Sequence, residues 1–492
     1  MARDDDAAAA AADGGSGSSA KRSGRTRAGV EENTLAILDA FESSDPRYSH
    51  DDRIAFLEAV RGASVVAENG TPPTNKMLEA VFRILRTGES LQSVMASFQL
   101  LNELDERYPR VCLSAGGTSE SSSAAQPELE VLEEAWSPLS LGSDSAYSGR
   151  AAVNENPCGP VDPSGFDLLI QILFTLVDGT NHQVFDIESL RNMLLLQYLI
   201  NFLEGDFSSR SNFYKETMDW TVIRESLLSM LLCSRRFSYK NLMKDCPSVL
   251  CGLRQLCTGF GNDLTLPEFS EAKSSKVCDT SLVIASLEVV DNTCTALQKL
   301  MTMIMELDAL KNQADKQGCT TRADGFRTPL LEIILDELTY NKEILSPYLQ
   351  VFNQPKWNLE LILQYLSKYT AKPSVRTRRS SDSTDDPTFG GVLKCLSNGS
   401  SLRSIMKKIG AEAVQLLLAH AFQAQLALSC KSHSSEGVLK SNGNAVDHSL
   451  MEICKHMISA FDGLKKVDER MDILPIGKEA LFVAATILST KS

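Results

Sequence analysis

Residues 91–109 read LQSVMASFQLLNELDERYP, and their apolar residues recur at spacings of three and four before the closing proline. A helix has about 3.6 residues per turn, so this spacing gathers the apolar side chains on one face. That face consists of Leu91, Val94, Met95, Phe98, Leu101 and Tyr108, and Pro109 ends the segment. Convincing alternation of apolar and polar residues between turn residues, the pattern of a strand, is missing. The chain is therefore predicted to be all-α.

The same spacing recurs along most of the sequence. One stripe, 331–338, follows Pro329, which suits a first helical position, with Thr328 as the expected N-cap. A dozen or more short helices joined by short turns favour an irregular armadillo- or HEAT-like helical solenoid over a four-helix bundle, although no fixed repeat period is present. The other predicted helices are 33–41, 53–67, 76–87, 166–177, 187–203, 220–233, one from near 281 to 307, 359–369, 404–428, 449–464 and 477–488.

Five segments contain too few large apolar residues to offset the entropy that ordering would cost. They are rich in Ala, Gly and Ser, in Pro, or in charged residues, and cover 1–29, 114–128, 142–164, 374–388 and 431–447. We expect a disordered N-terminal tail at 1–29 and disordered loops at the other four. Residues 30–492 are expected to form a single helical-repeat-like domain that carries these low-complexity inserts.

Composition limits the partners that the chain is expected to bind. Its 492 residues include 49 Lys and Arg against 63 Asp and Glu, which gives a net charge of −14. Sequence-independent DNA affinity comes from counterions released by basic side chains, so DNA contact is expected to be mainly indirect. The longest apolar candidate, Val414 to Leu428, is interrupted by polar residues and falls short of the roughly 20 residues that span a bilayer. We expect a soluble intracellular protein with no membrane partner.

Motifs for catalysis, phosphate binding and metal binding are missing from the sequence. GxxxxGK[ST], HExxH, EF-hand and GxSxG patterns do not occur. The twelve cysteines include no CxxC pair, and the tightest cluster, Cys246, Cys251 and Cys257, has no nearby histidine, which favours reduced cysteines over zinc. His420, inside an apolar helix, is expected to be structural. We therefore expect no enzyme activity, metal, cofactor or small-molecule substrate.

A basic loop carries the first candidate functional residues. Arg376, Arg378 and Arg379 precede Ser380 and Ser381. The arginines could form a nuclear-import signal or contact a partner or a phosphate, and phosphorylation of either serine by a basophilic kinase would reverse the local charge. The alternative is an ordinary solvated loop.

Two tryptophans are candidate anchors for a partner. Trp357 follows Pro355 and opens a predicted helix, where it could be a core residue or an exposed aromatic hot spot. Trp136 stands between two low-complexity stretches. An ordered tryptophan there has to dock, either on this protein's own body or on another chain.

Ten segments have amino-acid sequences that are more distinctive than helical periodicity alone requires. They are AVRGASVVAENGTPPTNKM (59–77), FRILR (82–86), ASFQLL (96–101), EEAWSP (133–138), ETMDW (216–220), MIMELD (303–308), RTPLLEIILDELTY (327–340), LQVFNQPKW (349–357), LQYLSKYTAKPSVRTRR (363–379) and ILPIGKEALF (473–482). Together they resemble the plant family called negative regulator of systemic acquired resistance, the suppressor of NPR-inducible immunity. The resemblance extends from near residue 30 to the C-terminus and is weakest in the inserts.

This resemblance implies a nuclear, non-enzymatic, armadillo-like helical protein that represses pathogenesis-related defence genes. The family is also similar in role to the non-catalytic loading subunits of the structural-maintenance-of-chromosomes five/six complex, which act in DNA-damage repair and homologous recombination. Implied partners are that complex with a second non-catalytic loading subunit, and transcription factors. Two alternatives stay open: a stand-alone transcriptional co-repressor recruited by a DNA-binding factor independently of the complex, and an enzyme whose motifs escape the scan.

Overall fold

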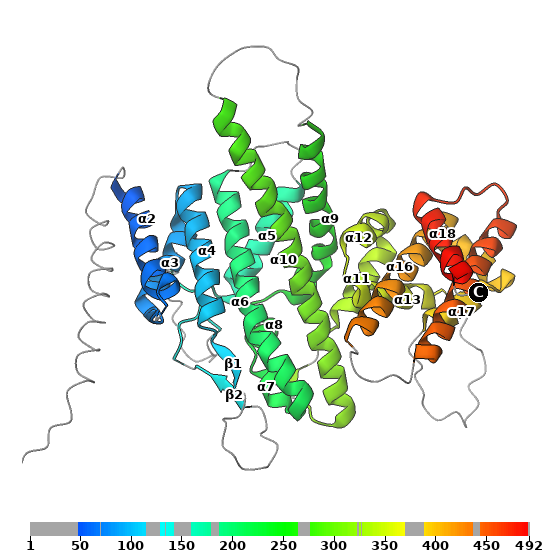
Figure 1. The fold of residues 1–492 in the computed structure, drawn as a ribbon, viewed down its shortest axis with the longest axis horizontal. Helices are drawn as coiled ribbons and strands as arrows, with labels where there is room; N and C mark the ends of the chain where they lie inside the picture. Colours follow the sequence, from blue (N-terminus) through cyan, green and yellow to red (C-terminus); the bar gives the residue numbers. More distant parts are fainter. Residues whose placement is uncertain are drawn as a thin grey trace, which may run out of the picture. The chain divides into compact units, whose positions relative to one another are not determined.

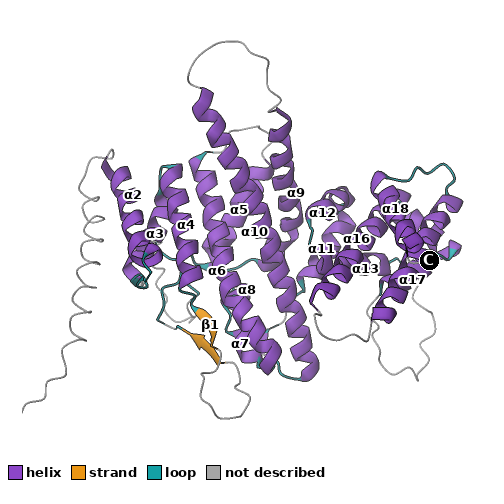
Figure 2. Ribbon diagram, viewed as in Figure 1, coloured by secondary structure: helices purple, strands orange, loops and turns teal. Residues whose placement is uncertain are grey.

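The computed structural model describes residues 48–68, 70–114, 128–132, 134–141, 159–178, 186–263, 276–321, 324–325, 327–369, 388–435 and 443–490. These residues are mainly helical, so the predicted all-α class is confirmed (Figure 2). They belong to two compact units, one within Met1–Arg110, Leu132–Pro138 and Ala152–Gly159, the other within Val111–Val131, Leu139–Ala151 and Pro160–Ser492. The single helical-repeat-like domain stays a prediction.

The described residues of the first unit form three helices, α2 (Tyr48–Arg61), α3 (Asn75–Thr87) and α4 (Leu91–Arg107), with a π-helical turn, η2 (Gly62–Val66), after α2. Polar caps set two of the helix starts, because the Thr74 and Ser90 side chains accept the N–H groups of Met77 and Ser93. Two residues of the predicted α4 stripe, Val94 and Leu101, are buried, whereas Leu91, Met95, Phe98 and Tyr108 are only partly buried. The buried face of α4 instead continues through Ser97, Leu100 and Leu104. Fully buried side chains in this unit include Phe56, Val60, Val81, Phe82, Leu85, Val94 and Leu101.

Four helices of the second unit pack together: α5 (Pro163–Asp178), α6 (Ile187–Thr217), α9 (Tyr239–Asp263) and α10 (Lys276–Gln317). The longest two, α6 and α10, lie side by side (Figure 1). Two short helices, α7 (Trp220–Arg224) and α8 (Leu227–Cys233), follow α6 and pack back onto it. The buried Gln197 amide links α6 to α10 by donating to the Val289 carbonyl at 2.9 Å.

The helices that follow pack onto α9 and onto one another, and the helical solenoid stays a prediction. Helices α11 (Leu330–Tyr340) and α12 (Leu345–Val351) contact α9, and a short 3-10 turn, η4 (Lys342–Ile344), separates them. Helix α13 (Pro355–Ser367) contacts α11 and α16 (Ala411–Ser435), and α16 contacts α18 (Pro475–Thr490). Helix α17 (Gly443–Val467) packs with α18, α14 (Phe389–Leu396) and α15 (Gly399–Ile409).

One stretch of α16 is longer and more apolar than expected from the sequence. Ala411–Cys430 is long and apolar enough to cross a membrane by length and composition, whereas the sequence had suggested no stretch of that length. About half of this apolar stretch is buried inside the protein. The expectation of no membrane partner stays a prediction.

A small sheet corrects the expectation that strands are missing. Strands β1 (Val111–Ser114) and β2 (Glu128–Val131) pair antiparallel, with Val111 opposite Val131. Each strand has four residues, too few for an alternating pattern to stand out in the sequence. Tertiary contact supports the sheet, since the Ser209 hydroxyl on α6 donates to the Val111 carbonyl at 3.2 Å.

Two predicted helices are each divided in the structure. The stretch 220–233 breaks between α7 and α8, where Ser226 caps the second helix by accepting the Ser229 N–H at 3.2 Å. The stretch 404–428 breaks at Gly410, whose φ of 90° is incompatible with a right-handed helix and disfavoured for any residue with a Cβ. Neither break could be predicted from the apolar spacing, because the spacing continues across both positions and does not depend on the backbone angles there.

Some predicted loops and ends are also corrected. Helix α9, which contains Pro247, and helix α14, which contains two adjacent glycines, were not among the predicted helices. Helices α16 and α17 extend into the segment 431–447, and α5 begins at Pro163, inside 142–164. The predicted helix 33–41 and the tail 1–29 lie outside the described residues.

Candidate functional site

The basic loop lies outside the described residues. Arg376, Arg378, Arg379, Ser380 and Ser381 fall between α13, which ends at Ser367, and α14, which begins at Phe389. Their interpretation as an import, partner or phosphorylation segment stays a prediction.

Trp136 docks on the first unit itself. Its ring meets Phe82 edge-on, with the ring centroids 5.2 Å apart. Its backbone N–H donates to the Asn75 side-chain oxygen at 3.3 Å, and the Asn75 amide donates to the Glu134 carbonyl at 3.1 Å. The segment therefore attaches to the start of α3. Of the two alternatives left open by the sequence, this is docking on the protein's own body.

Trp357 belongs to the core of the second unit. Only 9% of its surface is exposed, and it lies in the first turn of α13 behind Pro355. The Lys356 ammonium lies over the indole ring, 4.4 Å from its centroid. The core interpretation therefore fits Trp357, and its ring offers little surface to a partner.

The cysteine cluster on α9 has the character of core packing. Cys246 and Cys251 are buried, and burial raises the pKa of each thiol to about 12, so both stay protonated at neutral pH. Metal ligation needs the thiolate. Within the described ranges, no group of three or more His, Cys, Asp or Glu is placed to hold a metal ion. Burial likewise lowers the pKa of His420, as expected for a structural histidine in a core helix.

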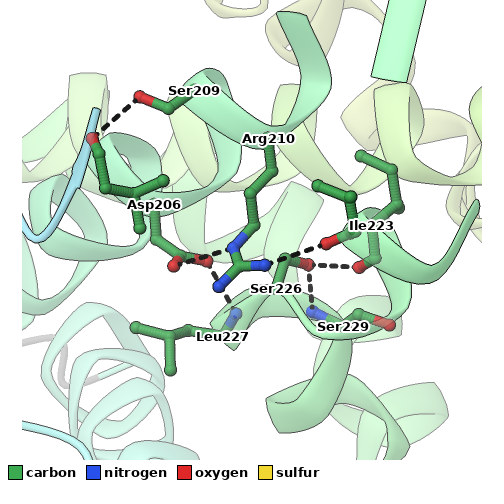
Figure 3. A network of polar contacts seen from close by, with 9 residues as sticks. Asp206, Ser209, Arg210, Ile223, Ser226, Leu227 and Ser229 are labelled. Atoms are coloured by element: carbon green, nitrogen blue, oxygen red, sulfur yellow. Dashed lines mark hydrogen bonds and ion pairs between the residues drawn. The ribbon is translucent and has the colours of Figure 1, made fainter. Parts of the chain in front are cut away.

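A buried ion pair holds α7 and α8 against α6 (Figure 3). Asp206 and Arg210 lie one turn apart on α6, and their side chains are only 3% and 7% exposed. One carboxylate oxygen accepts from Arg210 Nε at 3.1 Å, and the other accepts the backbone N–H of Leu227, the first residue of α8, at 2.8 Å. The guanidinium also donates to the Val222 carbonyl at 3.2 Å. One carboxylate thus satisfies a buried cation and caps a helix.

A second polar junction joins two of the distinctive segments. Asp308, at the end of MIMELD, accepts the Leu330 N–H at 2.8 Å and pairs with the Arg327 guanidinium, both in RTPLLEIILDELTY. Asp308 therefore caps α11 from another helix, which corrects the expected Thr328 cap; Pro329 is the N-cap residue and makes no side-chain cap bond. Arg327 also lies over the Tyr239 ring, 4.9 Å from its centroid, and burial raises the pKa of that hydroxyl well above its ordinary value.

A pocket of about 580 Å³ opens beside this junction. Part of its wall is a loop anchored from two sides: Trp220 Nε1 donates to an Asp324 carboxylate oxygen at 3.1 Å, and Lys311 Nζ donates to the Asp324 carbonyl at 3.2 Å. Burial alone would raise the pKa of Asp324, but hydrogen bonds from Thr321 and Trp220 hold it below its ordinary value. We call this cavity the Trp220 pocket; its lining includes the apolar Trp220, Met230 and Leu307 and the cations Arg224, Lys240 and Lys311.

Two family descriptions match consecutive parts of the chain. The SNI1 middle domain matches residues 110–354, and the SNI1 C-terminal domain matches residues 370–492. The protein named negative regulator of systemic acquired resistance SNI1 from Arabidopsis thaliana is 42% identical over 472 residues, covering 94% of this chain and 95% of that protein. The chain belongs to the SNI1 family. No solved structure matches it.

Family membership confirms the resemblance read from the sequence. The structure adds what the sequence did not indicate, namely that the ETMDW, MIMELD and RTPLLEIILDELTY segments meet around one pocket. The one available signal was that Trp220 ends ETMDW. The hydrogen-bond partner of its indole, Asp324, lies 104 residues away, so spacing alone could not find it.

Proposed function

We propose that this protein is a non-enzymatic nuclear scaffold that represses plant defence genes. We further propose that it is a non-catalytic subunit of the structural-maintenance-of-chromosomes five/six complex, through which it acts in DNA-damage repair and homologous recombination. The observation that carries the proposal is the 42% identity to the Arabidopsis negative regulator of systemic acquired resistance across 94% of the chain. That relative is named as a regulator, so the similarity supports a regulatory role for this chain.

Features of the described residues support a scaffold over a catalyst. Catalytic acid–base pairs usually have carboxyl groups whose pKa values are driven apart within one cleft. Here Asp186 caps α6 and Asp324 anchors a loop, so their low pKa values have structural causes. Asp167 has a raised pKa because it is buried, and it bonds Gln171 of its own helix at 2.8 Å.

Purification of the tagged full chain from nuclease-treated nuclear extract, with quantified mass spectrometry, tests the proposal. Nuclease removes chromatin tethering, so any partner that remains is held by protein contact. We expect the two chromosome-complex ATPases and one further helical subunit in fixed stoichiometry. Transcription factors recovered without these ATPases would contradict the complex and support the stand-alone co-repressor.

The basic loop gives a second test. Changing Arg376, Arg378 and Arg379 to Glu is expected to leave the helical signal intact and to weaken nuclear import or recovery of the partners. Unchanged localisation together with unchanged recovery would remove this loop from the proposal. A matched control makes the same charge change at exposed lysines on described helices, namely Lys394, Lys407 and Lys478.

A further inference from the structure

The Trp220 pocket combines an apolar interior with a positively charged rim. Trp220 and Leu307 line it and are nearly buried, whereas Met230, on α8, is 40% exposed. A partly exposed methionine is a flexible, polarisable surface that adapts to different apolar side chains. The cavity volume of about 580 Å³ lies within the roughly 300–1,000 Å³ typical of ligand pockets, so a large side chain can enter.

The charge around the pocket is opposite to that of the whole chain. Arg224, Lys240 and Lys311 contribute positive charge, and among the described residues that line the pocket the one carboxylate is that of Asp324, which Trp220 already engages. Arg327 also lines the pocket, but its charge is paired with Asp308. In a protein with a net charge of −14, a cationic rim is a local exception that favours an anionic ligand.

The cations differ in how free they are to engage a ligand. The Lys311 ammonium is held by the Asp324 and Gly325 carbonyls and stabilises the wall. Lys240 is exposed at the start of α9, and no ion pair of its side chain is seen within the described parts of the chain. Lys240 and the exposed Arg224 are therefore the rim charges best placed to meet an acidic group.

These features favour one kind of occupant. A nucleic-acid backbone would use the rim cations but leave the apolar interior empty, and a purely apolar segment would leave the cations without partners. An acidic peptide with one large apolar side chain uses both, since that side chain fills the pocket while flanking carboxylates meet the rim.

We propose that the Trp220 pocket is a docking site for a linear peptide segment of a partner protein. The segment places one aromatic or large aliphatic side chain against Trp220 and Met230, with Asp or Glu on either side facing Arg224 and Lys240. The inference rests on the proposed scaffold function, because it needs a protein partner, but it does not depend on which complex that partner belongs to.

Direct binding with the purified full chain tests the docking site. The probes are fluorescein-labelled 12-residue peptides with a central Trp, Phe, Leu or Met flanked by Asp and Glu, followed by fluorescence anisotropy at low and moderate salt. We expect at least one peptide to bind, and affinity to fall about tenfold with Lys240→Glu and again with Met230→Glu. Both residues are exposed, so circular dichroism should show unchanged helix content and melting temperature.

Matched controls separate docking from general charge attraction. Lys407→Glu, an equal charge change on α15 outside the pocket, should leave affinity within about twofold. Peptides with Ala at the centre, or with Lys in place of the acidic residues, should bind at least about tenfold more weakly. Equal binding of the Ala-centred peptides, competition by single-stranded DNA with no effect of Met230→Glu, or no binding by any peptide would overturn the proposal.

The two proposals fail in different ways. If the Met230→Glu variant loses peptide binding while the purified complex still assembles, the result supports the docking-site proposal and does not contradict the scaffold proposal. If the purified chain binds a peptide but recovers no subunit of the chromosome complex, the docking-site proposal stands and membership of the complex is contradicted.

Discussion

Removing the Asp206 carboxylate is the sharpest test of how α7 and α8 are held against α6. Asp206→Ala takes away both acceptors of the buried network: the oxygen bonded to Arg210 and the oxygen bonded to the Leu227 N–H (Figure 3). The substitution leaves the guanidinium buried beside one remaining acceptor, the Val222 carbonyl. It also removes the side-chain partner of the first N–H of α8.

The expected loss follows from the burial of both groups. Breaking a buried ion pair by removing one partner costs about 3–5 kcal/mol, because the other charge stays desolvated. The lost cap on α8 adds about 1 kcal/mol, although two losses at one carboxylate are not strictly additive. We therefore expect Asp206→Ala to lower the free energy of unfolding by about 4 kcal/mol, a large share of the roughly 5–15 kcal/mol typical of folded domains.

A second variant tests the cause of the loss. Adding Arg210→Met to Asp206→Ala replaces the unpaired cation with an apolar side chain of similar length. Because an apolar replacement of a buried pair is often nearly neutral, the double variant should recover most of the stability and remain about 1–2 kcal/mol below the parent, owing to the unsatisfied Leu227 N–H.

Urea unfolding followed by far-ultraviolet circular dichroism and tryptophan fluorescence measures these differences. Asp291→Ala is the control, since it breaks the Arg254–Asp291 ion pair, which has a similar distance of 2.9 Å but side chains about half exposed. That change should cost less than about 1 kcal/mol. A loss below 1 kcal/mol for Asp206→Ala, or no recovery in the double variant, would refute the reasoning.

Three further predictions concern backbone and cap positions. Gly252→Ala should destabilise by about 1–3 kcal/mol because its methyl would overlap the Val177 side chain, whereas Gly205→Ala, with open space around it, should stabilise α6 by about 0.5–1 kcal/mol; paired urea midpoints check both. Met218→Gly should raise the melting temperature by relieving about 1 kcal/mol of strain, since Met218 ends α6 with φ 58°. Asp186→Ala should cost about 1 kcal/mol at pH 7. Because cap hydrogen bonds lower the Asp186 pKa, that contribution is full above the ordinary value of about 3.9 and disappears as pH falls through the folded value, which urea titrations in acid can follow.

The helices themselves were largely predictable, because amphipathic spacing is a local property. Helix α4 is observed where the spacing predicted it, although its buried face is shifted toward Ser97 and Leu104, and the Pro355 start of α13 is observed. The breaks at Ser226 and Gly410 were not predictable, since apolar spacing continues across both and the decision lies in caps and backbone angles. The N-cap of α11 was placed wrongly for a related reason: its partner, Asp308, lies 22 residues earlier on another helix.

The candidate site depended even more on distant contacts. From its neighbours in sequence Trp357 was compatible with core, the commoner case, or with surface, and the packing of α13 places it in the core. The Trp220 pocket draws on residues from Trp220 to Thr328, joined by hydrogen bonds whose partners are up to 104 residues apart. Periodicity identifies a helix but cannot identify which helices share a cavity.

Stability and docking are coupled in this part of the molecule. Asp308 caps α11 and pairs with Arg327, which lines the Trp220 pocket, so loss of Asp308 should both destabilise the second unit and alter the pocket wall. A partner lost from an Asp308 variant would therefore not distinguish a docking contact from unfolding. Met230 and Lys240 are exposed at the same pocket and take no part in that junction. Variants at these two surface positions separate recognition from folding, and binding should change with them while the free energy of unfolding does not.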